Sequence, residues 1–194
     1  RPAMQSYAGD ALPFALSASL SARLRAFAGQ HGTTLFTVLL AGWSLLMARL
    51  SGQDDVVIGT SVANRAHPGT DRLIGFFVNT LALRIPVAGE LTVGGFIRQV
   101  KARVLDAFAH QELPFDQLVE ALQPVRALDH GPLVQNMLTL RNTTHDRTVR
   151  LPGLAVDVLP PPSHRTQFDL NLSLHDTGYT LAGRLAYATD LFDV

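Results

Sequence analysis

The chain has 194 residues, with sixteen basic and sixteen acidic side chains, so it lacks the basic excess typical of a nucleic-acid-binding domain. It has no cysteine, which excludes disulfides, a thiolate nucleophile and cysteine-ligated zinc and fits a reducing, cytoplasmic compartment. Charged residues make up only 16% of the chain, against about 25% in typical soluble domains, so we expect another segment to cover part of the surface.

The start of the chain and its most apolar run bear on targeting and membranes. The opening RPAMQSYAGDALPF has no signal-peptide pattern and no initiator methionine, so we expect the chain to be part of a longer polypeptide. The apolar run 35–50 contains polar residues and is shorter than the roughly 20 residues of a membrane span. We therefore predict a buried helix there and no membrane association.

Capping residues and apolar periodicity predict four helices, all in the first two thirds of the chain. The N-terminal caps of the first three are, in chain order, Ser17 or Ser19, Thr33 or Thr34, and Thr92. A break at 112–114 separates the third helix, whose apolar face runs from Val93 to Phe108, from a shorter one with Leu122 inward. Hydrophobic runs and alternation predict strands at 56–58, 73–87, 133–140, 151–159, 168–174 and 179–187. The pattern is that of an α/β fold, with helices first and strands later.

One predicted strand carries polar groups in an unexpected place. The run LIGFFVNTLALR, residues 73–84, is apolar apart from Asn79, Thr80 and its final arginine. If the run is one strand, Asn79 shares a face with Phe77 and Leu81. A buried amide without hydrogen-bond partners costs about 1–3 kcal/mol. Two explanations stay open: Asn79 closes a local turn that splits the run into two short strands, or it faces a substrate.

The residues alone show no complete catalytic set. No histidines have the spacing of a zinc site, no serine lies in GxSxG, and there is no glycine-rich phosphate loop. His67 and Asp71 have the H-x-x-x-D spacing used by some acyltransferases, but they lie in a Pro-Gly turn, so we expect coincidence. His110 ends a long helix, where it either serves the terminal carbonyls or touches substrate.

Three motifs together resemble those of the condensation domains of nonribosomal peptide synthetases. LIGFFVNTLALR is similar to the family pattern (I/V)GxFVNTxxxR. HQELPFD, residues 110–116, is similar to (H/N)QDxPFE, and RALDHGPL, residues 126–133, resembles RDxSRNPL more loosely. The first motif is matched at Ile74, Gly75, Phe77, Val78, Asn79, Thr80 and Arg84.

The resemblance implies a fold. Condensation domains consist of two lobes that each resemble chloramphenicol acetyltransferase, with an active-site tunnel between them and the catalytic HHxxxDG motif in the N-terminal lobe. None of the seven histidines here is adjacent to another. We therefore expect residues 1–194 to be the C-terminal lobe alone, a mixed β-sheet flanked by helices with no catalytic residue of its own.

The resemblance also implies an activity for the complete domain. It forms an amide bond between a donor acyl or peptidyl thioester and the amine of an acceptor aminoacyl thioester, both tethered to phosphopantetheine arms. The implied partners are the N-terminal lobe, carrier proteins and an adjacent adenylation domain, and this lobe alone would bind no cofactor and be inactive. Alternatives are a non-catalytic docking module, the equivalent lobe of an epimerisation or heterocyclisation domain, and a free-standing acyltransferase that uses His67.

The resemblance suggests roles for individual residues. The residues expected to line or support the substrate tunnel are Phe77, Asn79, Thr80 and His110. The residues expected to be structural are Gly75, Arg84, Pro114, Phe115 and Pro132. The candidates for segments that cross to the other lobe are 66–71 and 160–164.

Overall fold

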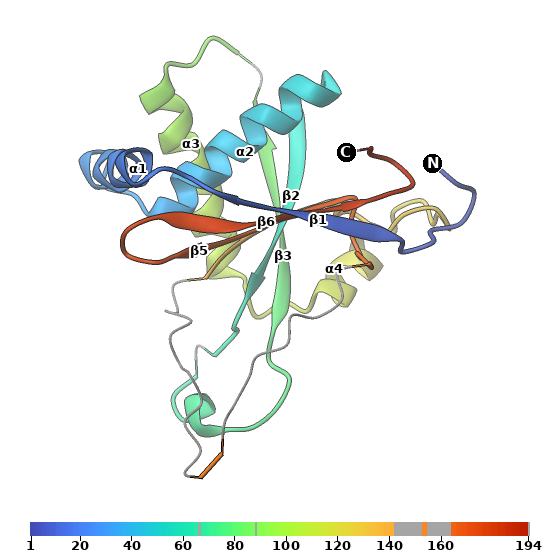
Figure 1. Cartoon of the computed structure of the whole chain (residues 1–194). Helices are drawn as coiled ribbons and strands as arrows, with labels where there is room; N and C mark the ends of the chain where they lie inside the picture. Colours follow the sequence, from blue (N-terminus) through green and yellow to red (C-terminus); the bar gives the residue numbers. More distant parts are fainter. Residues whose placement is uncertain (66, 88, 142–152, 155–163, 194) are drawn as a thin grey trace.

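The computed structural model describes residues 1–65, 67–87, 89–141, 153–154 and 164–193. Six strands form one sheet in the order β1-β6-β5-β4-β2-β3 (Figure 1). The strands are β1 (Gly9–Ala15), β2 (Asp55–Val62), β3 (Asn79–Pro86), β4 (Asn136–Arg141), β5 (Leu170–Asp176) and β6 (Leu181–Ala188). The helices are α1 (Ala18–Gln30), α2 (Leu35–Ser51), the short 3-10 helix η1 (Thr70–Arg72), α3 (Val93–Ala109) and α4 (Phe115–Leu122).

The sheet is mixed, as expected. Strand β4 runs parallel to both of its neighbours, β2 and β5, whereas the pairs β1–β6, β5–β6 and β2–β3 are antiparallel. Parallel neighbours need a long connection, and the helices α3 and α4 lie between β3 and β4 in the chain. The expected fold class, a mixed sheet flanked by helices, is therefore confirmed.

The predicted caps begin the three long helices. The side chains of Ser17, Thr34 and Thr92 each accept a hydrogen bond from a backbone N–H in the first turn of the helix that follows. Each cap thereby satisfies one of the N–H groups that a helix start leaves unpaired. Gly52 adopts the left-handed conformation, with a φ of 68°, and ends α2.

The hydrophobic core lies between one face of the sheet and the helices α1, α2 and α3. Along the strands, alternate residues point into it, as shown by Ile58 on β2, Leu83 on β3 and Leu138 on β4, which are almost completely buried. Leu40 of α2 and Val100 of α3 pack against them from the helical side. The opposite face carries mostly small and polar side chains, such as Ser61, Thr139 and Ser173, together with the buried Met137, which is paired with Gly59.

The structure corrects four points of the sequence analysis. Residues 73–78 are not a strand, because β3 begins only at Asn79. Strand β1 was not predicted, and β2 is longer than the predicted 56–58. Some helix positions predicted to face inward are instead well exposed, namely Val93, Phe108 and Leu122. The predicted strand 151–159 lies almost wholly outside the described residues.

Candidate functional site

Asn79 joins the first family motif to the second. Its Nδ2 donates to the carbonyls of Gln111 and Leu113 at 2.8 and 2.7 Å. Its Oδ1 accepts from the N–H groups of Thr80 and Phe115 at 2.9 and 3.1 Å. These four bonds occupy both amide hydrogens and both lone pairs of the carbonyl oxygen. Asn79 is only 9% exposed, and all hydrogen-bonding groups of its side chain are satisfied by other parts of the protein.

The same contacts fix the connection between α3 and α4. Phe115 begins α4, so its N–H has no partner within the helix and is satisfied by Asn79. Pro114 precedes it with a φ of −59° and ψ of 140°, which makes the chain extended at that point. At the other end, the Nδ1 of His110 lies 2.9 Å from the carbonyl of Asp106, in the last turn of α3. His110 thus contacts a terminal carbonyl of its own helix.

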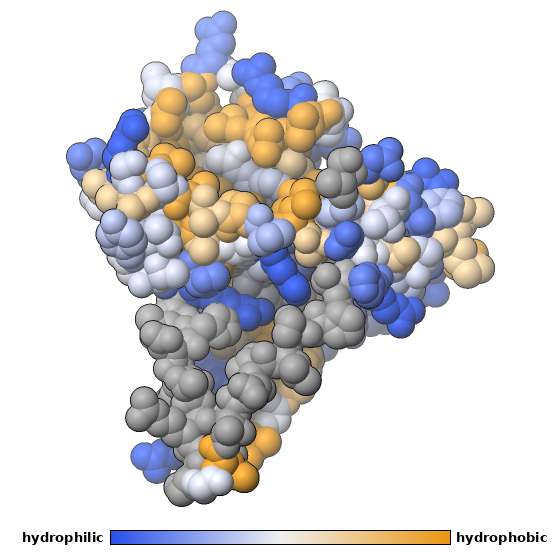
Figure 2. Space-filling view, in the orientation of Figure 1, coloured by the Kyte–Doolittle hydropathy of each residue, from blue (hydrophilic) through white to orange (hydrophobic). Residues whose placement is uncertain are grey.

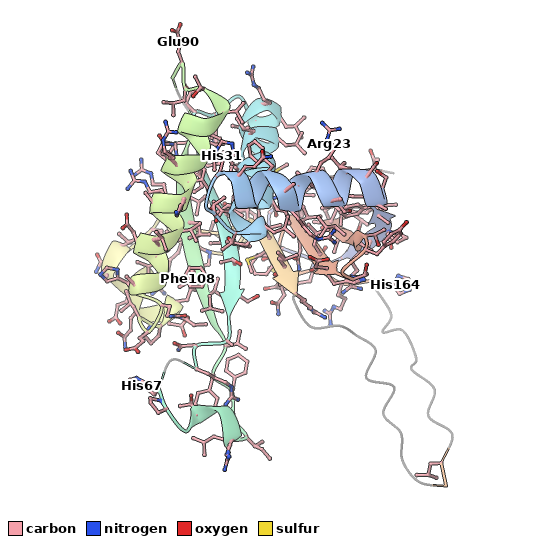
Figure 3. All side chains as sticks on the ribbon, turned by 90° about the vertical axis from the view of Figure 1, so that its left-hand side faces the viewer. Arg23, His31, His67, Glu90, Phe108 and His164 are labelled. Atoms are coloured by element: carbon pink, nitrogen blue, oxygen red, sulfur yellow. The ribbon has the colours of Figure 1, made fainter. Side chains whose placement is uncertain are left out.

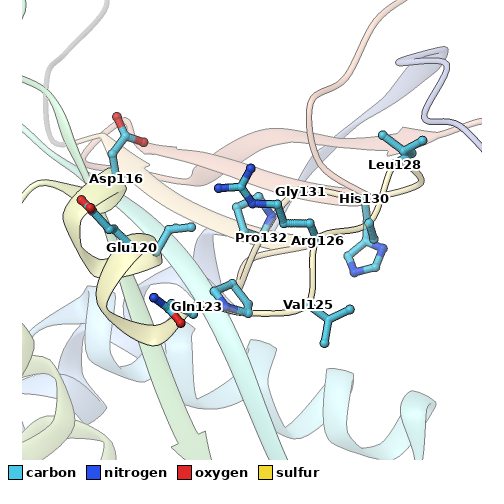
Figure 4. A pocket seen from close by; sticks show the side chains of 12 residues that line it. Asp116, Glu120, Gln123, Val125, Arg126, Leu128, His130, Gly131 and Pro132 are labelled. Carbon is cyan, nitrogen blue, oxygen red and sulfur yellow. The ribbon is translucent and has the colours of Figure 1, made fainter.

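The third motif lies beside the second. Residues of α4 and of the segment 123–132 surround a pocket of about 940 Å³ (Figure 4). Asp116 and Glu120 of α4 lie on one side of it, and Arg126 lies between them and His130. Asp129 accepts a hydrogen bond from His130 at 2.7 Å, which lowers the pKa of Asp129 below its ordinary value. Pro132 also lines the pocket. The three motifs therefore adjoin one another around the α3–α4 connection.

The loop between β2 and β3 carries the remaining residues of the first motif. Figures 1 and 3 show this loop projecting beyond the ends of the two strands, and Figure 3 labels His67 within it. Ile74 is fully exposed and Phe76 is 91% exposed. Phe77 is half-buried, and a Cβ added to Gly75 would come within 3.0 Å of its ring. Two large apolar side chains thus point away from the body, whereas Phe77 packs within the loop.

A row of hydroxyl groups crosses the sheet face that is turned away from the core. Thr80 is paired with Ser61, whose Oγ lies 3.4 Å from the Oγ1 of Thr139. Thr139 is paired with Ser173, and Ser173 with Arg184. The hydroxyl row therefore spans β3, β2, β4 and β5 in order, and Arg184 of β6 lies beside its last member. These side chains are half-buried or exposed.

Of the residues in this row, only Thr80 was predicted from the sequence. Ser61, Thr139 and Ser173 each alternate with buried residues, which places them on the outer face of their own strands. Their alignment depends on strand register, which the sequence does not reveal for parallel neighbours that lie far apart in the chain. On the same face, Arg84 forms an ion pair with Asp55 at 2.6 Å.

Three further features bear on function: the surroundings of His67, groups that could bind a metal ion, and helices that could cross a membrane. The exposed His67 lies 3.2 Å from Glu112, so its described partner is a carboxylate of the α3–α4 connection. Within the described ranges, no cluster of three or more histidine, aspartate or glutamate side chains is placed to hold a metal ion. Over the same ranges, no single helix is long and apolar enough to cross a membrane; α1 and α2 meet those criteria only as a pair bent by 107°.

Comparison with known proteins shows similarity in sequence and in fold. The family model described as "Condensation domain" matches residues 1–194. Malpinin synthetase from Mortierella alpina is 46% identical over 193 residues, and the phosphinothricin tripeptide synthetase PhsB from Streptomyces viridochromogenes is 42% identical over 196. Both matches cover all of this chain but only 2% and 16% of those proteins.

Solved structures give the same result. A four-domain nonribosomal peptide synthetase bound to AMP and glycine matches with a TM-score of 0.90 and 29% identity, over all of this chain and 16% of that one. The X-domain from teicoplanin biosynthesis matches with a TM-score of 0.89 and 26% identity, over all of this chain and 44% of that one. With the match of the family model over the whole chain, these similarities show that the chain belongs to the condensation domain family.

Proposed function

We propose that this chain is the C-terminal lobe of a peptide-bond-forming condensation domain, completed by a lobe that carries the HHxxxDG histidine. The observation that carries the proposal is the β2–β3 loop, which exposes Ile74 and Phe76 while Asn79 anchors its end to the α3–α4 connection. Burying an apolar side chain of this size is worth about 1.5–3 kcal/mol, so a second lobe that covers both would gain stability. The match to only 44% of the X-domain chain also supports a missing second lobe.

In the proposed reaction, the amine of an acceptor aminoacyl thioester attacks the carbonyl carbon of a donor thioester. A C–N bond forms, the C–S bond breaks, the donor thiolate leaves on its phosphopantetheine arm, and the amine loses a proton. The histidine of the other lobe handles that proton, and this lobe contributes no catalytic residue. Its contribution is geometric, since holding two tethered reactants in line can lower a barrier by about 7–11 kcal/mol.

We assign the hydroxyl row to the wall of the substrate tunnel. The hydroxyls of Thr80, Ser61, Thr139 and Ser173 can each donate and accept, which suits the amide groups of a pantetheine arm or a peptidyl chain. Asn79 and His110 have a supporting role in this proposal, because the amide and the Nδ1 that could contact a substrate already face backbone carbonyls.

The proposed partners are two carrier proteins and an adjacent adenylation domain. The chain covers a small part of much longer synthetases, and the similar four-domain synthetase is described as bound to AMP and glycine, which supports a multidomain setting. Phosphopantetheine arrives on the carriers, and the lobe itself needs no bound cofactor. We place the protein in the cytoplasm, where such synthetases find their substrates.

The proposal is tested by measuring dipeptidyl product on an acceptor carrier by mass spectrometry, with the complete condensation domain. The variants S61A and S173A each remove one hydroxyl of the row, and we expect turnover to fall about tenfold for each lost hydrogen bond. The matched control is S19A, which removes an exposed hydroxyl from the first turn of α1. Equal turnover in all three variants would contradict the assignment of the row to the tunnel wall. Absence of product from the unmodified complete domain would favour a docking module.

A further inference from the structure

Arg65 makes three contacts inside the β2–β3 loop. It lies three residues after the end of β2, and its Nη1 donates hydrogen bonds to the carbonyls of Thr70 and Leu73, the second at 3.1 Å. Its guanidinium carbon lies 4.2 Å from the centre of the Phe77 ring, in the position of a cation–π contact. The described contacts of Arg65 are thus two carbonyls and an aromatic face rather than a carboxylate.

These contacts join the start, the middle and the end of the loop. Thr70 belongs to η1, Leu73 follows it, and Phe77 lies two residues before β3 begins. The close approach of Gly75 to the Phe77 ring leaves no room for a side chain there without movement of the ring. Arg65, Phe77 and Gly75 therefore form one packed unit.

The position of this unit determines where the exposed residues point. Ile74 and Phe76 flank Gly75, and both side chains project into solvent. Apolar side chains on a free loop gain by collapsing onto the nearest apolar surface. A loop tied internally at Thr70, Leu73 and Phe77 resists that collapse and keeps both side chains outward.

We propose that Arg65 is a positioning residue that pre-organises the β2–β3 loop for contact with the second lobe. This proposal rests on the proposed function for its partner, but the internal order of the loop is a property of this chain. A planar guanidinium is suited to the role because it can donate several hydrogen bonds while stacking on a ring, which a lysine ammonium cannot do. Fixing the loop before the lobes meet removes an ordering cost from each encounter.

The first test measures loop order in this chain. Arg72 is exposed and lies within the loop, so trypsin cleavage after it reports how often the loop opens. We expect R65A to be cleaved there at least tenfold faster than the parent chain, and R65K to give an intermediate rate. The control is R23A, which removes an exposed arginine from α1. Thermal unfolding should be similar for all four proteins. Unchanged cleavage after Arg72 in R65A would overturn the proposal.

The second test measures turnover in the complete condensation domain. We expect R65A to lower kcat ten- to a hundredfold, with less change in the KM for the carrier-bound acceptor, because a misplaced loop disturbs alignment more than docking. Faster cleavage together with an unchanged kcat would overturn the positioning role. If the unmodified complete domain made no product, the proposed function would fail, whereas the cleavage rates would still decide whether Arg65 orders the loop.

Discussion

Replacing Asn79 with alanine removes the contact that joins the first family motif to the second. The substitution deletes all four hydrogen bonds of the amide. It leaves the carbonyls of Gln111 and Leu113 and the first N–H of α4 without their partner at a site where Asn79 was 9% exposed. We expect the α3–α4 connection to loosen and α4 to move away from the start of β3.

The expected loss follows from the number of bonds. Each intramolecular hydrogen bond contributes a net 0.5–1.5 kcal/mol, and water entering the vacated space would recover part of the total, so we expect N79A to lose about 2–4 kcal/mol of unfolding free energy. For a chain of this size, 1 kcal/mol shifts the melting temperature by about 2–4 °C, so the decrease should be on the order of 10 °C.

The assay is thermal and denaturant unfolding of N79A and N79D, followed by circular dichroism. N79D keeps the oxygen that accepts from Thr80 and Phe115 but turns a second oxygen toward the carbonyls of Gln111 and Leu113. At pH 7 the ionised carboxylate cannot donate to those carbonyls and faces their oxygens, so N79D should be less stable than the parent chain at that pH. An unchanged melting temperature for N79A, with reduced turnover in the complete domain, would refute the structural role and favour a substrate-facing amide.

Three further experiments test other parts of the structure. In G183A the new Cβ would clash with the backbone oxygen of Ser173, so the free energy of unfolding should fall by several kcal/mol. In G42A, on an open part of α2, the free energy of unfolding should rise by about 0.5–1 kcal/mol. Equal effects of the two substitutions would contradict the sheet geometry. The hydrogen bond from Arg25 lowers the pKa of Asp176, so the pair stabilises the fold above pH 4 and the contribution is lost as pH falls further. D176N should therefore lower stability by about 1 kcal/mol at pH 7 and by much less at pH 3, and a pH-independent loss would contradict this. The double variant I74S/F76S should leave unfolding of this chain unchanged but weaken its binding to a separately supplied N-terminal lobe, measured by calorimetry; undiminished binding would show that the loop does not meet that lobe.

Local signals were sufficient for the helices. Ser17, Thr34 and Thr92 cap α1, α2 and α3 because a side-chain oxygen satisfies N–H groups only a few residues away. The half-buried strands β5 and β6 were predictable for a similar reason, since alternation is visible within each segment. Strand β1 was missed because GDALPFA has a glycine, a proline and little alternation; it is a strand through its pairing with β6, at the other end of the chain.

Long-range contacts account for the remaining errors. The run LIGFFV was predicted to be a strand because it is apolar, but composition does not distinguish a buried strand from a loop that exposes apolar side chains such as Ile74 and Phe76. Neither explanation kept open for Asn79 anticipated partners 32 to 36 residues away. Likewise, Ser61, Thr139 and Ser173 form a row only through the register of strands that are distant in sequence.

The central claim is that this chain is one half of a condensation enzyme, and one assay tests it most directly. Donor and acceptor carriers loaded with aminoacyl thioesters would be incubated with this chain alone, with an N-terminal lobe alone, and with both, and dipeptidyl product on the acceptor would be measured by mass spectrometry. The account predicts product only when both lobes are present. Product from this chain alone would contradict it and direct attention to His67, and no product from the combined lobes would contradict the proposed function.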